Sequence, residues 1–154
     1  MAPPVEAAVE RNEFIEIVES RNPRTVFEPL GIRVVRYDPD AMQVSMDVDH
    51  RHLQHLGMLH GGVSALLAES AASLAAAMSV NLRTHIVAGV DLNATHLRPK
   101  RSGRLVATAR PLYRGRTTHV YGIEITDEKD ELVCVARCTI AIRPLAQDSR
   151  EDSA

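Results

Sequence analysis

Glu69 is the only charged residue between Gly61 and Leu82, in a stretch made mostly of alanine, serine and larger apolar residues. A carboxylate on an ordinary helix faces water, but the far side of this helix is made of small residues. They are Ala65, Ala68, Ala72, Ala75 and Ala76. A helix without a polar side is packed on both sides, and a buried carboxylate is costly unless it is paired or has a chemical task. We therefore expect Glu69 to attack a carbonyl carbon or to activate water, with Ser73 one turn further along the same flank.

His60, Gly61 and Gly62 lead into this helix. The first N–H groups of a helix have no partner inside it, glycine lets a ligand approach the backbone, and the helix dipole adds partial positive charge. These features suit a carbonyl oxygen that becomes negative during a reaction, as in an oxyanion hole. The alternative is a plain tight turn into a helix.

Histidines gather ahead of the helix, at His50, His52, His55 and His60. Imidazole suits zinc, but this spacing matches no standard zinc motif and no cysteine lies nearby. We expect solvated loop histidines, His60 excepted, and no metal. His96 alternates in phase with Val90, Leu92 and Ala94, which is typical of a histidine that finds its partners within a sheet.

The two cysteines, Cys134 and Cys138, lie four residues apart in a predicted strand. They point to the same face, too far apart for a disulfide, so we expect structural thiols. So few cysteines exclude a secreted disulfide framework and favour a reducing compartment. The first residues have no basic segment and no apolar run, so no secretory signal is expected and the predicted location is cytoplasmic.

Composition favours an ordinary folded domain. The 154 residues are 45% hydrophobic and 25% charged, with 18 basic and 20 acidic side chains. Because basic and acidic residues are nearly balanced, the composition gives no sign of a basic surface that would bind nucleic acid or an anionic membrane. A central carboxylate argues against a membrane helix at residues 61–82. Basic residues at strand ends and turns form either a solvated rim or a patch for the phosphates of a small ligand. They are Arg98, Lys100, Arg101, Arg104, Arg114, Arg116 and Arg143.

Hydrophobic periodicity predicts the elements that position these residues. A short helix is expected at residues 10–20 and a long helix at residues 63–80. The apolar stripe of the long helix is Val63, Leu66, Leu67, Leu74 and Met78. Strands are expected at residues 31–37, 42–48, 86–98, 104–113, 118–126 and 132–143.

Short connections between these strands predict antiparallel neighbours. Because the sheet needs a cover and only one long apolar helix is available, the predicted fold is α+β, an antiparallel sheet curled around that helix. The predicted organisation is an N-terminal arm with a short helix at residues 1–29, one domain at residues 30–144 and a disordered tail at residues 145–154.

The segment QHLGMLHGGVSALLAESAAS, residues 54–73, resembles the signature of the hotdog-fold acyl-CoA thioesterases. It is most similar to the branch that includes 1,4-dihydroxy-2-naphthoyl-CoA thioesterase and 4-hydroxybenzoyl-CoA thioesterase of the glutamate type. The resemblance covers residues 30–144 and continues in VAGVDLNATHLRP, in the turn PLYRGRTT and in AIRP at the last strand. It implies the hotdog fold, a sheet of about six strands wrapped around one long helix.

The resemblance also implies roles for single residues. Glu69 would be nucleophile or general base, the N–H of Gly61 would polarise the thioester carbonyl, and Gln54 would orient it. His60 would assist positioning, and Ser73 would hold the hydrolytic water. Further residues would bind the CoA and acyl portions of the substrate: Gly89, His96, Leu97, Arg98, Pro99, Tyr113, Arg114, Gly115, Arg116, Thr117 and Thr118.

The implied reaction is hydrolysis of an acyl-CoA thioester without a cofactor. The implied assembly is a homodimer whose sheets join at a shared active site, with two dimers forming a tetramer. Two alternatives stay open at this point: a hydratase or dehydratase on the same fold, and a non-catalytic acyl-CoA binder. The resemblance does not extend to residues 1–29.

Overall fold

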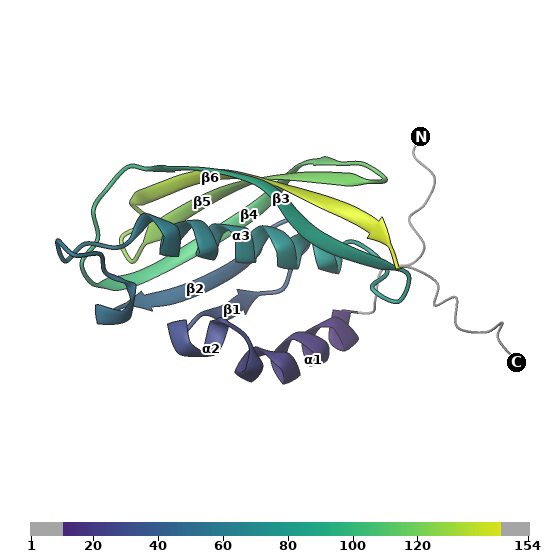
Figure 1. Cartoon of the computed structure of the whole chain (residues 1–154), viewed down its shortest axis with the longest axis horizontal. Coiled ribbons are helices and arrows are strands. Elements are labelled where there is room, and N and C mark those ends of the chain that lie inside the picture. The colour runs from purple at the N-terminus through teal and green to yellow at the C-terminus, as the bar shows by residue number, and fades with distance from the viewer. Residues whose placement is uncertain (1–10, 146–154) are drawn as a thin grey trace, which may run out of the picture.

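The computed structural model describes residues 11–145, which form a six-stranded antiparallel sheet, a long helix and a helical N-terminal arm (Figure 1). In chain order the elements are α1 (Arg11–Arg21), η1 (Asn22–Arg24), α2 (Phe27–Leu30), β1 (Arg33–Arg36), β2 (Met42–Val48), η2 (His50–His52), α3 (Gly61–Met78), β3 (His85–His96), β4 (Gly103–Arg114), β5 (Thr118–Asp127) and β6 (Leu132–Pro144). The predicted helices and strands all form, so the α+β class is confirmed. The first ten residues of the predicted arm and residues 146–154 of the predicted tail lie outside the described residues, and the division into arm, domain and tail stays a prediction.

The sheet order is β1-β2-β4-β5-β6-β3. The hairpins β1–β2, β4–β5 and β5–β6 follow the expectation that consecutive strands pair. That expectation is wrong for β3, which pairs with β6 from His85 opposite Pro144 to His96 opposite Cys134. β4 pairs instead with β2.

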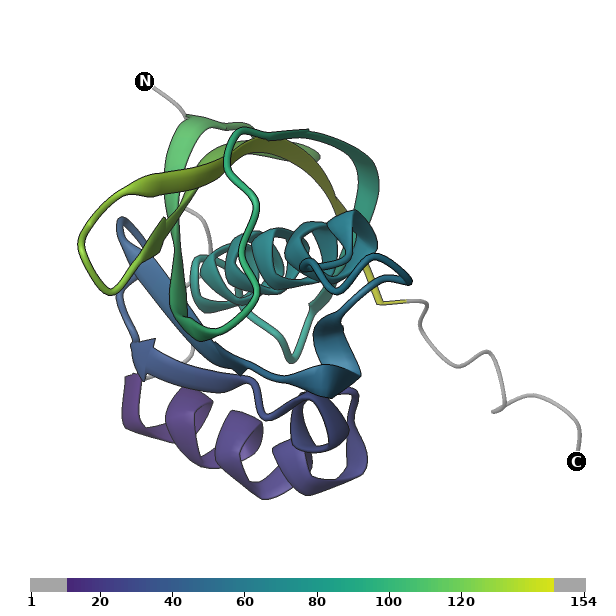
Figure 2. The same cartoon turned by 90° about the vertical axis from the view of Figure 1, so that its left-hand side faces the viewer.

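The curl of the sheet explains this order, because β3 closes over one flank of α3 while β2 and β4 lie on the other (Figure 2). Residues 97–102 carry the chain from one flank to the other. They pass the loop that precedes α3, where the N–H of Leu59 donates to the carbonyl of Lys100 at 2.7 Å. A short connection therefore joins two strands that are far apart in the sheet.

Small residues form the side of α3 that packs against the sheet. Ala68, Ala71, Ala72, Ala75 and Ala76 are fully buried, so the helix is packed on its alanine side as expected. The predicted apolar stripe is only partly correct: Leu67 and Met78 are buried, whereas Val63, Leu66 and Leu74 are half-buried. A strongly curled sheet comes close to the helix, and close packing favours small side chains there. α3 is long and apolar enough to cross a membrane, but eight of its 18 residues are buried inside the protein.

The N-terminal arm covers the β1–β2 end of the sheet (Figure 1). Phe14 is 1% exposed and meets Tyr37 edge to face, with ring centroids 6.2 Å apart. Arg83, just after α3, pairs with Glu13 at 2.7 Å. Burial of an aromatic ring is worth roughly 1.5–3 kcal/mol, so Phe14 is the main anchor of α1.

Candidate active site

The N-terminus of α3 presents a free backbone donor. His60 is the N-cap, and its Nδ1 accepts the N–H of Gly62 at 2.9 Å. Val63 and Ser64 donate their N–H groups to the carbonyl of His60. Among residues 11–145, the N–H of Gly61 has no acceptor, so it remains available to a ligand oxygen at the positive end of the helix.

Gln54 lies in a tight turn beside this helix end. Its backbone N–H donates to the carbonyl of Met58 at 2.7 Å, and its side-chain Oε1 accepts the N–H of Leu56. Gly57 has φ +72°, and Arg101 Nη1 donates to its carbonyl at 3.1 Å. Because Oε1 is engaged within the turn, the amide NH₂ of Gln54 is the group left to donate to a substrate carbonyl.

One pocket of about 330 Å³ gathers several of the predicted residues. Its lining comes from the turn, from the start of α3, from the end of β3 with the segment after it, and from the start of β6. The lining residues are Gln54, Met58, Leu59, Gly61, Ser64, His96, Leu97, Arg98, Pro99 and Val133. Residues from four separate parts of the sequence therefore meet at the helix N-terminus.

His96 packs directly over Gly61. A Cβ at Gly61 would lie 2.8 Å from His96 Nε2, so this close approach requires glycine. The other ring nitrogen, Nδ1, is 3.1 Å from Ser64 Oγ, which in turn donates to the carbonyl of Gly61 at 3.0 Å. Ser64 thus fixes the imidazole against the helix end, a role that the sequence did not reveal.

Glu69 lies on the flank of α3 that faces β3, half-buried. It lines a second hollow of about 490 Å³, together with Phe27, Gly62, Ala65, Leu66, Ser70, Ser73, Leu74 and Leu92. Within the described part of the chain its carboxylate makes no hydrogen bond and no ion pair. A carboxylate on a mostly apolar hollow without a fixed partner is free to act on a ligand there.

Gly89 provides the space for this carboxylate. A Cβ at Gly89 would overlap Glu69 Oε1, and the register of β3 against β6 shifts immediately after Gly89. The bulge also breaks the predicted alternation, because Val90 no longer continues the phase of Leu92 and His96. Ser73 lines the same hollow one turn further along α3, as expected.

In a single chain these residues do not form one site. Gln54, Gly61 and His96 line one pocket, whereas Glu69 and Ser73 line the other. The carboxylate of Glu69 and the free N–H of Gly61 therefore lie on the same helix but face different hollows.

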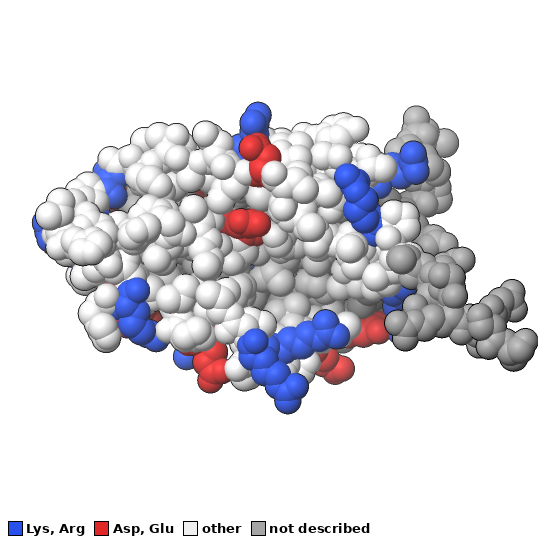
Figure 3. All heavy atoms as spheres, in the orientation of Figure 1, with Lys and Arg blue, Asp and Glu red and all other residues white. Residues whose placement is uncertain are grey.

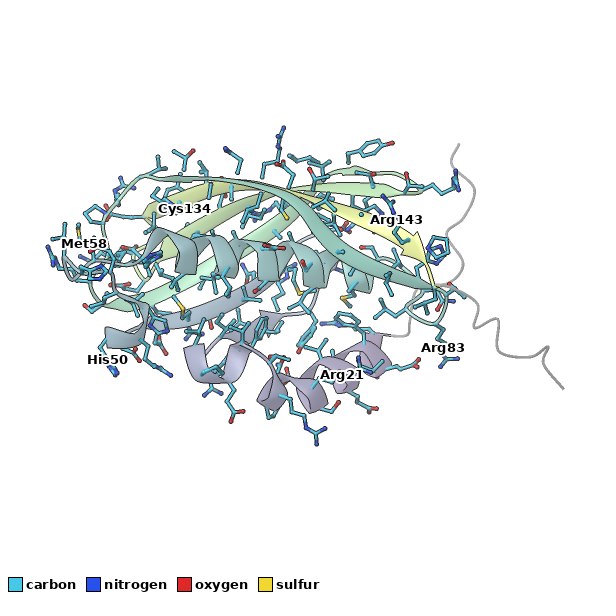
Figure 4. The ribbon with its side chains drawn as sticks, viewed as in Figure 1. Arg21, His50, Met58, Arg83, Cys134 and Arg143 are labelled. Atoms are coloured by element: carbon cyan, nitrogen blue, oxygen red, sulfur yellow. The ribbon has the colours of Figure 1, made fainter. Side chains whose placement is uncertain are left out.

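The predicted CoA-binding turn between β4 and β5 lies at the other end of the molecule. Figure 4 shows Met58 and Arg143 at opposite ends, and Arg143 Nη1 donates to the carbonyl of Thr117 at 3.2 Å. Within this turn, the N–H of Gly115 donates to the carbonyl of Thr118 at 2.8 Å, while Tyr113, Arg116 and Thr117 are exposed. Arg114 pairs with Asp40 at 2.7 Å, so its guanidinium also holds the β1–β2 turn.

Several of the basic residues at strand ends and turns make contacts within the chain. Lys100 pairs with the buried Asp127 at 3.0 Å, and Arg104 donates to Ser45 Oγ at 3.2 Å. Arg98 Nη1 donates to the carbonyl of Leu132 at 2.5 Å. Because these side chains hold loops and strand ends in place, only their remaining N–H groups are available to bind a phosphate.

His52 corrects the expectation of solvated loop histidines. It is fully buried, with Nδ1 accepting the N–H of Asp49 at 2.9 Å and Nε2 lying 2.9 Å from the carbonyl of Leu30. The imidazole of His52 therefore connects the loop that precedes α3 with the end of α2. Among residues 11–145, no group of three or more histidine, cysteine or acidic side chains is placed to hold a metal.

Cys134 and Cys138 are buried free thiols on β6. Burial, with a contribution from the negative charge of Glu69, raises the pKa of Cys138 to about 12. Burial also raises the pKa of Cys134. Both thiols are therefore structural, because the reactive thiolate form is suppressed.

Comparison with known proteins assigns this arrangement to a family. A family model described as the thioesterase superfamily matches residues 56–134. The thioesterase PA1618 of Pseudomonas aeruginosa is 40% identical over 132 residues, covering 86% of this chain and 91% of that protein. The 1,4-dihydroxy-2-naphthoyl-CoA hydrolase of Listeria monocytogenes is 43% identical over 116 residues, covering 75% of this chain and 94% of that protein.

The fold agrees with these matches. The crystal structure of a mutant of thioesterase PA1618 superposes with a TM-score of 0.81, at 35% identity, covering 92% of this chain and 99% of that one. The sheet around a central helix is thus the hotdog fold implied by the resemblance. The chain belongs to the thioesterase superfamily and is a hotdog-fold enzyme that hydrolyses thioesters.

Proposed function

We propose that this enzyme hydrolyses an acyl-CoA thioester to the free acid and CoA. The observation that carries the proposal is the Glu69 carboxylate, unpaired within the described residues and facing a mostly apolar hollow against Gly89. The matching relative named as a 1,4-dihydroxy-2-naphthoyl-CoA hydrolase supports CoA as the thiol part of the substrate.

The chemistry needs few groups because a thioester is already activated. The free N–H of Gly61 and the amide NH₂ of Gln54 donate to the thioester oxygen as it gains negative charge. Glu69 either attacks the carbonyl carbon or takes a proton from a water molecule held by Ser73. In both routes water supplies the new oxygen of the acid, the C–S bond breaks, and CoA leaves as the thiol. His60 accepts the N–H of Gly62 and so fixes the backbone beside the N–H of Gly61.

We place the complete site between two copies of the chain. β3 is a twelve-residue strand at the edge of the sheet, hydrogen-bonded to β6 on one side only within residues 11–145. Long open edges favour pairing with another strand. The face that carries α3 and β3 is largely uncharged, with acidic residues near its middle and most other charged residues at its margins (Figure 3).

A two-fold axis across β3 would run the two copies antiparallel. The end of one copy near Met58 would then lie beside the end of the other near Arg143. Glu69 of one copy would approach Gly61 and Gln54 of the other, and the turn carrying Arg116 would approach the same pocket to bind CoA phosphates. Pairing of two such dimers would give the tetramer.

A mixing experiment tests the shared site. Gln54→Ala and Glu69→Ala are each expected to be inactive, but reassembled mixtures should regain activity, because one of the two sites in each mixed dimer has both residues intact. If the site were formed within one chain, every site in the mixture would carry one substitution and activity would stay absent. Light scattering gives the oligomeric state of each sample.

The substrate class is tested with matched thioesters. Thiol release is measured for aryl and straight-chain acyl-CoAs and for the same acyl groups on pantetheine, with Glu69→Ala as the control. Faster Glu69-dependent hydrolysis of the CoA thioesters supports the proposal. Equal rates for both thiols exclude CoA recognition, and tight CoA binding without thiol release indicates a binding protein.

A further inference from the structure

Phe27 of the arm separates two hollows. It lines the 490 Å³ hollow that contains Glu69, and it also lines a hollow of about 390 Å³ between the arm and β1. Among the described residues it is the only one that lines both. We propose that Phe27 is a specificity-determining residue that limits the size of the acyl group, an inference that rests on the proposed thioesterase function.

The lining of the Glu69 hollow indicates the kind of acyl group. Leu66, Leu74 and Leu92 line this hollow together with Phe27, and Ser70 and Ser73 of α3 add hydroxyl groups to the lining. With the thioester carbonyl near Glu69, the acyl group extends along leucine side chains toward the phenyl ring. The structure therefore favours compact apolar acyl groups, aromatic or short-chain, that end at Phe27.

The hollow beyond Phe27 has a mixed lining. Pro23, Ile32 and Val34 provide apolar surface, and Glu19, Glu28 and Arg33 provide charge. Removal of the phenyl ring would join this space to the Glu69 hollow. A longer chain would then extend between the arm and β1.

The backbone around Phe27 is held firmly. Its carbonyl accepts the N–H of Ile32 at 2.8 Å, next to Gly31, which has φ +62°. Arg51 Nη1 donates to the carbonyl of Pro29 at 2.6 Å, and His52 holds the carbonyl of Leu30. The backbone that carries the ring is therefore fixed, partly by the segment that leads to Gln54.

Substitutions of opposite size test this role. Phe27→Ala should move the preference of kcat/KM toward longer acyl chains, with the long-to-short ratio rising about tenfold or more, and Phe27→Trp should move it toward shorter ones. Val26→Ala is the matched control, because Val26 precedes Phe27, is 44% exposed and lines neither hollow. If both Phe27 variants lower all rates in parallel, or leave the profile of an active wild type unchanged, the ring has only a structural role and the proposal fails.

A binding readout separates this proposal from catalysis. The chain has no tryptophan, so the indole introduced by Phe27→Trp is the only one. In a Phe27→Trp, Glu69→Gln double variant, saturating acyl-CoA should shift the indole emission, and CoA alone should not. An unchanged emission while calorimetry detects acyl-CoA binding would overturn the role of Phe27. Absence of Glu69-dependent turnover together with an emission shift would overturn the proposed hydrolysis and support the role of Phe27 in acyl binding.

Discussion

Gly89 on β3 lies against the carboxylate of Glu69 on α3 so closely that a Cβ at position 89 would overlap Oε1. This contact joins the edge strand to the flank of the central helix. It explains why the strand carries a glycine there, followed by a shift in register.

Gly89→Ala is therefore expected to displace the Glu69 carboxylate. A reacting group misplaced by about 1 Å costs on the order of 10²-fold in rate, so kcat should fall by about that factor. Ala88→Ser, on the exposed neighbouring residue, is the matched control and should retain wild-type kcat. Full activity in Gly89→Ala would mean that the position of the carboxylate is not critical.

Gly61→Ala should reduce activity by about 10²-fold, because its Cβ meets His96 and shifts the N–H group that is proposed to bind the thioester oxygen. Alanine retains the backbone N–H group, so a double-mutant cycle with His96→Ala tests whether the collision with the ring causes the loss. Once His96→Ala has removed the ring, adding Gly61→Ala should cost less than about twofold in kcat/KM. Additive losses would show that Gly61 acts independently of His96.

The pair of Lys100 and Asp127 should influence both stability and substrate binding. Hydrogen bonds from Lys100 and from the backbone N–H of Lys129 hold the pKa of Asp127 at about 2. Asp127→Asn should lower Tm and raise KM severalfold, because the carbonyl of Lys100 also accepts the N–H of Leu59, two residues before Gly61. Glu128→Gln, at the exposed partner of the same lysine, should have the smaller effect on both quantities. A larger effect of Glu128→Gln would reverse this assignment.

His119 should make stability depend on pH. It is 3% exposed, and burial followed by the positive charge of Arg114 lowers its pKa below the ordinary 6.5. The unfolded chain then binds the proton more readily than the folded chain, so the stabilisation is complete above the ordinary pKa and is lost as the pH falls below it. Thermal unfolding from about pH 7 to about pH 5 should show a steeper fall in Tm for the wild type than for His119→Gln. Equal slopes would exclude His119 as the cause.

Period-two and helical patterns predicted the helices and strands of the domain, because the spacing of apolar residues shows which side chains share one buried face. The place of β3 was not predictable in this way, since the short connection to β4 hides a crossing between opposite flanks of α3. The prediction that the large apolar residues of α3 form its main buried stripe was only partly correct. The tightly curled sheet packs against the alanines, and Leu66 and Leu74 line the hollow that contains Glu69.

Isolation and spacing singled out Glu69 and the glycines at the helix start as candidate residues, and their chemical roles stay predictions; the structure places Glu69 and Gly61 in the lining of two hollows. The residues that surround these candidates and hold them in place were not predicted. Ser64, Phe27 and the buried His52 act through contacts with segments distant in the sequence, and no local pattern reports such contacts.

Kinetics of Glu69→Gln on the best substrate of the wild type, together with its affinity for the same thioester, test the central claim most directly. Glutamine keeps the size and removes the charge of the side chain, so kcat should fall by at least about 10²-fold while Kd stays within a fewfold. A kcat near that of the wild type would contradict the account, because the unpaired carboxylate beside Gly89 would then have no part in the reaction.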